Sequence, residues 1–155
     1  AMQWLPVKEY TLESITAELD ELVRLRRFTQ EERELLNERS LYTFFESSLG
    51  QRLIKSKHIE KELPFSMLLE GHRVYEDLKD GEELFLQGIV DTVFEENGAW
   101  VLVDYKTDRV KSEKELIHRY RIQMDLYKEA LQRLTGMDVK ESYIYSFRLH
   151  KAILV

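Results

Sequence analysis

The chain has 155 residues, 43% of them hydrophobic, and a formal net charge of −6 at pH 7. This length and composition fit one domain with a substantial core, and the negative charge excludes DNA binding that depends on bulk electrostatic attraction. Without any cysteine, the chain cannot form a disulfide, a thiolate zinc site or a cysteine-ligated iron–sulfur cluster. No apolar run is long enough to cross a membrane and no signal peptide is recognisable, so we expect a cytoplasmic protein with no membrane partner.

Helices are expected over the first third of the chain. Residues 11–28 carry apolar side chains at helical spacing, and Thr11 is the expected N-cap of that helix. A short helix should follow from Thr29-Gln30 to about Asn37, and a longer one should run from Ser40 to Lys55. The inward-facing side chains of the longer helix are expected to be Leu41, Phe44, Phe45, Leu49 and Leu53.

A first core strand is expected at residues 58–69. It contains Pro64, which implies an edge strand or a bulge because proline has no N–H to donate to a ladder. Taken by itself, Glu62 is best interpreted as a solvent-facing residue of this strand. The polar stretch from Gly71 to Glu83 is expected to be a loop or an irregular hairpin tip.

The clearest local signal is a β-hairpin in the middle of the chain. Residues 84–94 and 99–105 are rich in β-branched and aromatic types, and Asn97-Gly98 between them is the preferred pair for a two-residue type I′ turn. With that turn, Asp91 lies directly opposite Asp104, their Cβ atoms roughly 4.5 to 5.5 Å apart. A four-residue loop would make them diagonal neighbours on the same face, whereas a three-residue loop would separate them.

Two facing carboxylates destabilise a sheet unless a positive charge lies between them. A divalent cation satisfies this need, and oxygen ligands favour Mg²⁺ or Mn²⁺. Lys106, two residues after Asp104, points to the same side of its strand. The alternative is therefore that Lys106 alone neutralises Asp91 and Asp104 without a metal.

A long helix is expected from Ser112 to Thr135, with Gly136 as its C-cap. Gln123 and Tyr127 are four residues apart, so they are neighbours on one side of this helix. A tyrosine at such a position is more often a core residue than a functional one. The expected core stripe comprises Ile117, Tyr120, Met124, Tyr127, Leu131 and Leu134.

Two further strands, at residues 142–148 and 152–155, are expected to complete the sheet. None of the four histidines has metal-ligand spacing. Basic residues gather before the first strand and after Lys106, where they would provide local DNA contacts or simply a solvated face. These residues are Arg52, Lys55, Lys57, Lys61, Arg109, Lys111, Lys114, Arg119 and Arg121.

Three motifs in this order resemble those of the PD-(D/E)xK nuclease superfamily, specifically its RecB-like branch. Residues 88–91 (GIVD) match a GxxD motif, residues 104–107 match DYKT, and Gln123 with Tyr127 matches QxxxY. The likeness extends from about Gly50 to Phe147 and is greatest to the C-terminal nuclease domain of the AddA (RexA) family.

The resemblance implies an α/β, restriction-endonuclease-like fold. A mixed central sheet would be flanked by helices, in the order α-β-β-β-α-β. Residues 1–57 would form the N-terminal helical segment of the nuclease domain, truncated upstream, and residues 58–155 the nuclease core of the same single domain.

The implied activity is Mg²⁺-dependent hydrolysis of DNA, with Mn²⁺ as a substitute. The expected reaction is 3′ to 5′ exonuclease cleavage of single-stranded DNA from unwound duplex ends, during double-strand break processing for homologous recombination. The partner would be the AddB (RexB) subunit, through the full-length helicase-nuclease. This chain has no G-x-x-x-x-G-K-[ST] motif, so ATP hydrolysis must occur elsewhere.

The resemblance also implies roles for individual residues. Asp91 and Asp104 would hold the metal with the main-chain carbonyl of Tyr105, and Lys106 would orient the attacking water and stabilise the transition state. The remaining implied site residues are Glu62 near the metal, and Gln123 and Tyr127 at the mouth of the site.

The chain is expected to depart from the family pattern at one point, and two alternative functions remain. The family is expected to carry a metal-binding histidine on a helix just upstream of Ala1, so this chain would lack one ligand. A non-catalytic nuclease-like module that binds DNA or docks onto a partner is the main alternative, against which the intact Asp91, Asp104 and Lys106 argue. A stand-alone site-specific endonuclease is less well supported because no separate target-recognition region is evident.

Overall fold

The computed structural model describes residues 1–70 and 83–155. The predicted loop from Gly71 to Glu83 lies outside these residues, except for Glu83 itself. The described elements are α1 (Leu12–Arg24), α2 (Gln30–Leu35), α3 (Glu38–Glu46), α4 (Ser48–Lys55), β1 (Ile59–Glu70), β2 (Glu83–Glu96), β3 (Ala99–Lys106), α5 (Glu113–Thr135), β4 (Val139–Ser146) and β5 (Lys151–Leu154).

The strands form one mixed sheet in the order β1-β2-β3-β4-β5. Only β3 and β4 pair in parallel, and α5 connects them, as a parallel crossover requires. The other neighbouring pairs are antiparallel. The predicted α/β fold with a mixed sheet flanked by helices is therefore confirmed, and the strand suggested near the C-terminus is β5.

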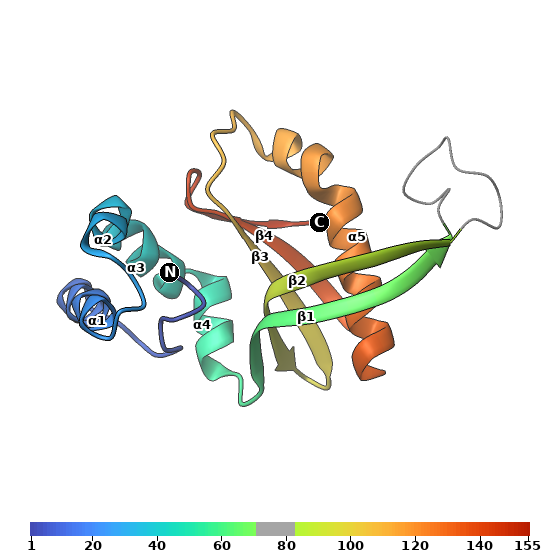
Figure 1. Ribbon diagram of the computed structural model, residues 1–155, viewed down its shortest axis with the longest axis horizontal. Coiled ribbons are helices and arrows are strands. Elements are labelled where there is room, and N and C mark those ends of the chain that lie inside the picture. The colour runs from blue at the N-terminus through green and yellow to red at the C-terminus, as the bar shows by residue number, and fades with distance from the viewer. Residues whose placement is uncertain (71–82) are drawn as a thin grey trace.

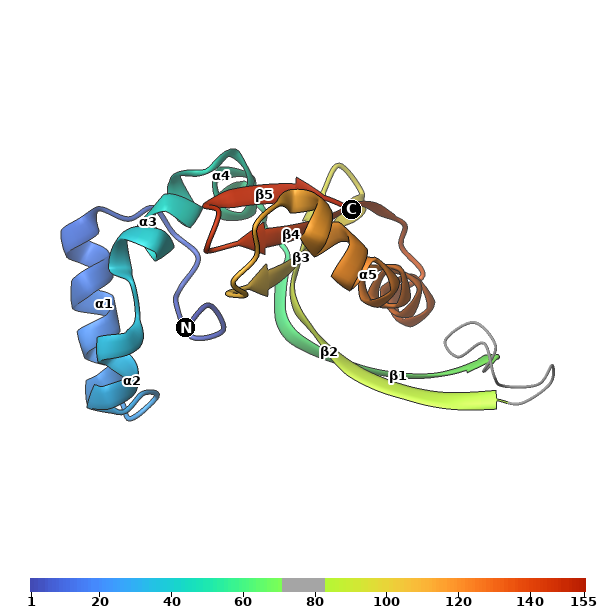
Figure 2. The same cartoon turned by 90° about the horizontal axis from the view of Figure 1, so that it is seen from above.

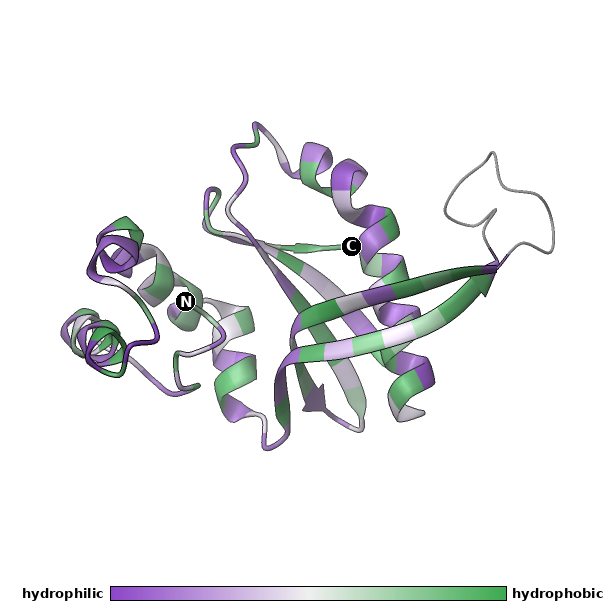
Figure 3. Cartoon of the chain, in the orientation of Figure 1, coloured by the Kyte–Doolittle hydropathy of each residue, from purple (hydrophilic) through white to green (hydrophobic). Residues whose placement is uncertain are grey.

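Helices cover both faces of this sheet (Figure 1). On one face, α1, α3 and α4 bury their apolar residues against alternate residues of the strands, among them Phe94, Val101 and Tyr145. On the other face, α5 packs Met124 and Leu131 against the intervening strand positions. The N-terminal helices accordingly carry both hydrophobic and hydrophilic segments (Figure 3). In the described part of the chain, no helix is long and apolar enough to span a bilayer.

The first two helices begin where the sequence predicts. Thr11 caps α1 through a reciprocal pair of hydrogen bonds with Ser14, and Thr29 caps α2 in the same way with Glu32. The first helix ends earlier than predicted, at Arg24, because Arg26 adopts a left-handed conformation with φ 56°.

The predicted helix from Ser40 to Lys55 is wrong as a single element. Ser47 is extended (φ −66°, ψ 156°), which ends α3, and its hydroxyl accepts a hydrogen bond from the N–H of Gly50 to start α4. At Gly50 a Cβ would lie 2.1 Å from the carbonyl oxygen of Phe44, so only glycine permits this close approach. The five predicted inward-facing side chains are nevertheless all buried.

The central hairpin has the predicted turn and register. Asn97 and Gly98 both have positive φ (55° and 77°), as a type I′ turn demands, and Glu96 pairs with Ala99. Strand β1 lies at the edge of the sheet, which explains how Pro64 is accommodated.

The bounds of the long helix agree with the prediction, but the residues on its buried face agree only in part. Ser112 caps α5, and Gly136 ends it with φ 68°. Leu116 and Ala130 are buried although they are outside the predicted stripe, whereas Leu134 is 56% exposed near the last turn. The next strand, β4, runs from Val139 to Ser146, whereas a strand was expected at residues 142–148. The connection from α5 to β4 is therefore shorter than expected.

Strand β2 is longer than its pairing with β3. It pairs with β1 along most of its length, out to Glu83 and Glu70, but with β3 only from Thr92 to Glu96. The β1–β2 ribbon therefore continues as a curved arm away from the rest of the sheet (Figure 2). The point where β2 and β3 separate forms a fork in the sheet.

Candidate active site

The two aspartates lie at this fork. The ladder between β2 and β3 ends at Thr92 and Val103, so Asp91 and Asp104 occupy the first positions beyond it. The expectation that they form a directly opposed ladder pair is wrong, because the strands diverge one residue earlier. The carboxylate of Asp91 instead accepts a hydrogen bond from the main-chain N–H of Tyr105 at 2.8 Å. This contact replaces the ladder partner that β2 no longer supplies.

Asp104 is a buried carboxylate with unused bonding capacity. It is 2% exposed, and among the described residues its Oδ2 atom has no hydrogen-bond partner. The ammonium of Lys106 lies 2.7 Å from Oδ2 and compensates its charge in an ion pair. Burial raises the pKa of Asp104 to about 6, against the opposing effect of Lys106.

Lys106 connects the fork to α5. Its Nζ atom makes a long 3.5 Å hydrogen bond to the Gln123 side-chain oxygen, and the amide nitrogen of Gln123 donates to the Tyr127 hydroxyl at 2.7 Å. The structure thus brings together Asp104, Lys106, Gln123 and Tyr127 from two different motifs, as the resemblance implies.

The glycine of the GxxD motif has a steric explanation. A Cβ on Gly88 would lie 2.6 Å from the ring of Phe65, which in turn packs edge-on against Tyr127 with centroids 5.5 Å apart. Glycine at this position lets both rings lie over β2. Gly88 therefore helps to set the position of Tyr127, and through it that of Gln123.

Glu62 lies on β1, beside Asp91 of the neighbouring strand β2. It falls between two residues of β1 that pair with Thr92 and Val90, yet it has no ladder partner itself and adopts a positive φ of 52°. This conformation is costly for a residue with a Cβ, and such residues concentrate at functional sites. Glu62 is exposed, as its sequence pattern suggests, and it faces a cavity shared with Asp91.

This cavity has a volume of about 420 Å³. The N-terminal residues Ala1 to Gln3 form part of its wall, and the ammonium of Lys61 holds this segment by donating to the carbonyls of Met2 (2.8 Å) and Leu5 (2.5 Å). The wall is completed by residues from α2, α3 and the segments after β3 and β4. Glu62, Asp91, Tyr105 and Thr107 are also among the residues that line the cavity.

The donor atoms at the fork are carboxylate oxygens, the kind of ligand that a small divalent cation takes. Asp104 offers a buried carboxylate whose Oδ2 is in contact with the Lys106 ammonium, and Asp91 uses only Oδ2 in its bond to Tyr105. Within residues 1–70 and 83–155, however, no cluster of three or more acidic, histidine or cysteine side chains is close enough to hold a metal. The two aspartates would thus leave several coordination positions to other ligands.

Two residues near Lys106 are not among the site residues that the sequence predicts. The Nζ atom of Lys106 lies 4.2 Å from the ring centroid of Tyr120, and the Tyr120 hydroxyl donates to Asp108 at 2.7 Å. Tyr120 precedes Gln123 by three residues, a spacing that puts both on one helix face. That spacing could have identified Tyr120, whereas nothing in the sequence indicates the position of Asp108.

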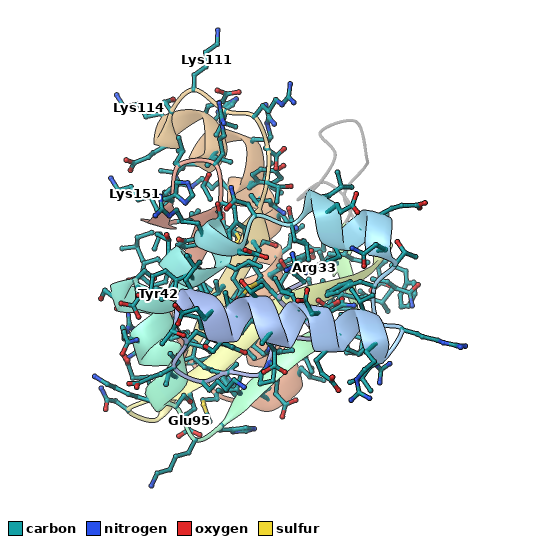
Figure 4. The ribbon with its side chains drawn as sticks, turned by 90° about the vertical axis from the view of Figure 1, so that its left-hand side faces the viewer. Arg33, Tyr42, Glu95, Lys111, Lys114 and Lys151 are labelled. Carbon is teal, nitrogen blue, oxygen red and sulfur yellow. The ribbon has the colours of Figure 1, made fainter. Side chains whose placement is uncertain are left out.

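Within residues 1–70 and 83–155, some of the basic side chains have acidic partners and others have none. Arg119 is bound to Asp108 and Glu115, and Arg52 to Glu96 and Glu141, so both are structural. Lys111 and Lys114 extend outward at the end of the molecule where α5 begins, close to Lys151 (Figure 4). Of these three, Lys151 is paired, with Glu113 at 2.5 Å.

The raised pKa of Asp104 makes a prediction about stability. Since the folded chain holds this proton more tightly than the unfolded chain, the free energy of unfolding should decrease as pH rises from about 4 through 6, and the loss should persist above that. Asp104→Asn, which cannot ionise, should escape this loss. In EDTA, the stability of the variant relative to wild type should thus increase by about 2 to 3 kcal/mol between pH 4 and pH 7.5.

Urea unfolding at the two pH values measures this difference. Asp125→Asn, which removes an exposed carboxylate on α5, is the matched control and should show no comparable change. If the difference between Asp104→Asn and wild type is the same at both pH values, burial does not govern the ionisation of Asp104.

Comparison with known proteins agrees with this geometry. Residues 5–153 match the family model of the PD-(D/E)XK nuclease superfamily. The chain is 41% identical over 145 residues to the A subunit of the ATP-dependent helicase/nuclease of Syntrophomonas wolfei, with 92% of the chain covered. Proteins of the same name from Thermoanaerobacter sp. (39% over 145 residues, 90% covered) and Clostridium botulinum strain Loch Maree (38% over 159 residues, 99% covered) are also similar.

The chain spans only 12% of the length of each of these three relatives. What they have in common with it is therefore a nuclease module within a much longer protein. The family match covers the fork, the lysine and the helix that carries Gln123. The chain therefore belongs to the PD-(D/E)XK nuclease superfamily.

Proposed function

We propose that this chain is the metal-dependent nuclease module of an AddA-type (RexA) helicase-nuclease. Its substrate would be single-stranded DNA from unwound duplex ends, cleaved in the 3′ to 5′ direction during double-strand break processing for homologous recombination. The AddB (RexB) subunit would be its partner through the full-length protein. The names of the relatives support the helicase-nuclease context.

The observation that carries this proposal is the buried carboxylate of Asp104, which is held in an ion pair with Lys106. It is next to Lys106 and near Asp91, at the position where two strands separate. The single ammonium of Lys106 compensates only one of these two carboxylates. A divalent cation would supply the further positive charge that the pair needs.

Asp91 and Asp104 would hold Mg²⁺, or Mn²⁺ in its place, with the main-chain carbonyl of Tyr105 as a further ligand. When bound, the ion supplies Lewis-acid polarisation of the scissile phosphate. Lys106 orients the attacking water and offsets the negative charge that develops on the phosphate oxygens. Glu62 lies between the β1 residues that pair with Thr92 and Val90 and lines the same cavity as Asp91, where it would accept a hydrogen bond from a water.

Gln123 and Tyr127 have a supporting role in this proposal. The Gln123 side-chain oxygen contacts Lys106, and its nitrogen is fixed by Tyr127. The pair therefore limits the movement of the Lys106 ammonium. DNA contacts would come from local basic residues such as Lys111 and Lys114, because the chain as a whole is acidic.

The proposed reaction is tested with the full-length helicase-nuclease in complex with its partner. Single-stranded DNA labelled at the 5′ end should be shortened progressively in Mg²⁺, whereas a 3′ label should be released at once, and EDTA should stop both reactions. Cutting at one internal sequence of a duplex would instead identify a site-specific endonuclease. Tight DNA binding without any cleavage would identify a non-catalytic module.

A further prediction concerns the chain upstream of Ala1. Residues 1–3 border the same cavity as Glu62 and Asp91, so a preceding helix with the family histidine would have access to the proposed metal. A longer chain that includes this helix should therefore bind Mn²⁺ at least about tenfold more tightly and cut single-stranded DNA faster, since the ion gains a ligand.

Calorimetric Mn²⁺ titration of the 155-residue chain, the longer chain and a longer chain with that histidine replaced by Ala measures this effect. The replaced chain should return to the affinity of the short one. Equal affinity and equal cleavage by the short and longer chains would mean that the site is complete within these 155 residues.

A further inference from the structure

Lys106 has three partners at the fork, and they are not equivalent. Its ammonium lies 2.7 Å from an oxygen of Asp104, 3.5 Å from the Gln123 side-chain oxygen and 4.2 Å from the ring centroid of Tyr120. The nearest of these is the oxygen that the proposed metal would need. If Asp104 bound a cation, Lys106 would lose its nearest partner and would lie close to a second positive charge.

The Tyr120 ring would then be one of two remaining contacts of Lys106, with Gln123 as the other, and the ring is well fixed. Its hydroxyl donates to Asp108 at 2.7 Å, and the same Asp108 oxygen accepts from Arg119 at 3.0 Å. The ring also packs against two apolar clusters, one that contains Met124 and Leu131 and one that contains Leu116. Tyr120 therefore presents the face of a ring whose position does not depend on Lys106.

An aromatic face attracts an ammonium through its quadrupole, and this attraction grows when water is excluded. The side chain of Lys106 is only 16% exposed, which places the contact in the favourable range. A hydroxyl that donates to a carboxylate adds electron density to its ring, which favours the same attraction. Unlike the carboxylate of Asp104, the ring is not a candidate metal ligand, so this contact would not compete with a bound ion.

We propose that Tyr120 is a positioning residue, which holds the Lys106 ammonium toward the scissile phosphate when Asp104 is engaged by the metal. This inference rests on the proposed function, because it assumes that Lys106 acts in cleavage. Asp108 and Arg119 serve it indirectly by fixing the ring. The residue acts through Lys106 and touches neither DNA nor metal.

The test combines Tyr120→Leu, which removes the ring, with Tyr120→Phe, which keeps it. In the full-length helicase-nuclease, Tyr120→Leu should lower the single-turnover cleavage rate about 3- to 30-fold, with KM for DNA and the dissociation constant for Mn²⁺ unchanged. Tyr120→Phe should retain most of the wild-type rate. When Lys106 is already replaced by Gln, Tyr120→Leu should cause no further loss, because the two residues act together.

A second readout does not involve activity. In the metal-free 155-residue chain, the ε-methylene protons of Lys106 should show an upfield ring-current shift by NMR. The shift should persist in Tyr120→Phe and disappear in Tyr120→Leu. The Lys106 signals are assigned by their loss in Lys106→Gln.

Three results would overturn the inference. These are a wild-type rate for Tyr120→Leu, a loss of rate that is as large in the Lys106→Gln background, or a Phe variant as slow as the Leu variant. In each case Lys106 remains essential and the proposed function stands. Full activity of Lys106→Gln alone would instead overturn the proposed function and this inference with it.

Discussion

Replacing Asp104 by Ala is expected to abolish DNA cleavage while leaving the fold intact. The substitution removes the buried oxygen proposed to bind the metal, and with it the Lewis-acid contribution of several kcal/mol to the barrier. We expect a decrease in rate on the order of 10³-fold or more. Asp91→Ala should have the same consequence, and it also removes the acceptor for the Tyr105 N–H.

The rate should be measured at saturating Mg²⁺, with the full-length helicase-nuclease acting on single-stranded DNA. Asp125→Ala, on the exposed side of α5, is the control for loss of one negative charge. Metal-free stability of Asp104→Ala should equal or exceed that of wild type at pH 7.5, because a buried charge has been removed. A variant that has lost metal binding and still cuts at the wild-type rate would refute the assignment of the site.

Replacing Lys106 by Ala is expected to spare metal binding and to remove most of the chemical rate. Its ammonium is proposed to act on the attacking water and on the charge that develops on the phosphate, rather than on the ion. Loss of a positioned electrostatic stabiliser typically costs on the order of 10² to 10³ in rate. Single-turnover cleavage at saturating metal, with Mn²⁺ affinity measured in parallel, separates the two effects.

The opposite pattern would assign Lys106 a different role. If Lys106→Ala binds Mn²⁺ much more weakly and cuts normally once the metal saturates, the lysine only balances the charge of Asp104. Lys114→Ala is a suitable comparison, since Lys114 is an exposed lysine of α5. Its loss should weaken DNA binding slightly and leave the rate at saturating DNA unchanged.

Much of the fold could be predicted because its strongest signals are local. The turn at Asn97-Gly98 requires positive φ at two positions, and few residue pairs other than this one supply it. The caps at Thr11, Ser112 and Gly136 likewise mark helix ends by hydrogen bonds within a few residues. The placement of Lys106 on the same face as Asp104 follows from strand periodicity alone.

The errors occur where tertiary contacts override local preference. Ser40 to Lys55 has a continuous helical pattern, but Ser47 is extended and separates two helices, a break that brings Gly50 close to the main chain of Phe44. Strand divergence beyond Thr92 and Val103 is a property of the whole sheet, so periodicity could not reveal that Asp91 leaves the ladder. Leu134 is 56% exposed although it continues the helical spacing of the core stripe.

The sequence indicates which residues lie together at the candidate site more fully than it indicates their geometry. Asp104, Lys106, Gln123 and Tyr127 contact one another as expected, whereas Tyr120 was assigned only to the core. The positive φ of Glu62 has no signature in the sequence, because glutamate rarely adopts it. Such strain arises from the structure around a residue.

The central claim is that Asp91 and Asp104 together bind a divalent cation, and calorimetric titration of Mn²⁺ into the 155-residue chain tests it most directly. Wild type and Asp125→Asn should bind one ion with the same affinity at pH 7.5. Asp91→Asn and Asp104→Asn should each weaken that binding by a factor of about 10 to 100 or abolish it. Unchanged Mn²⁺ affinity in both aspartate variants would contradict the account, since the fork would then hold no metal.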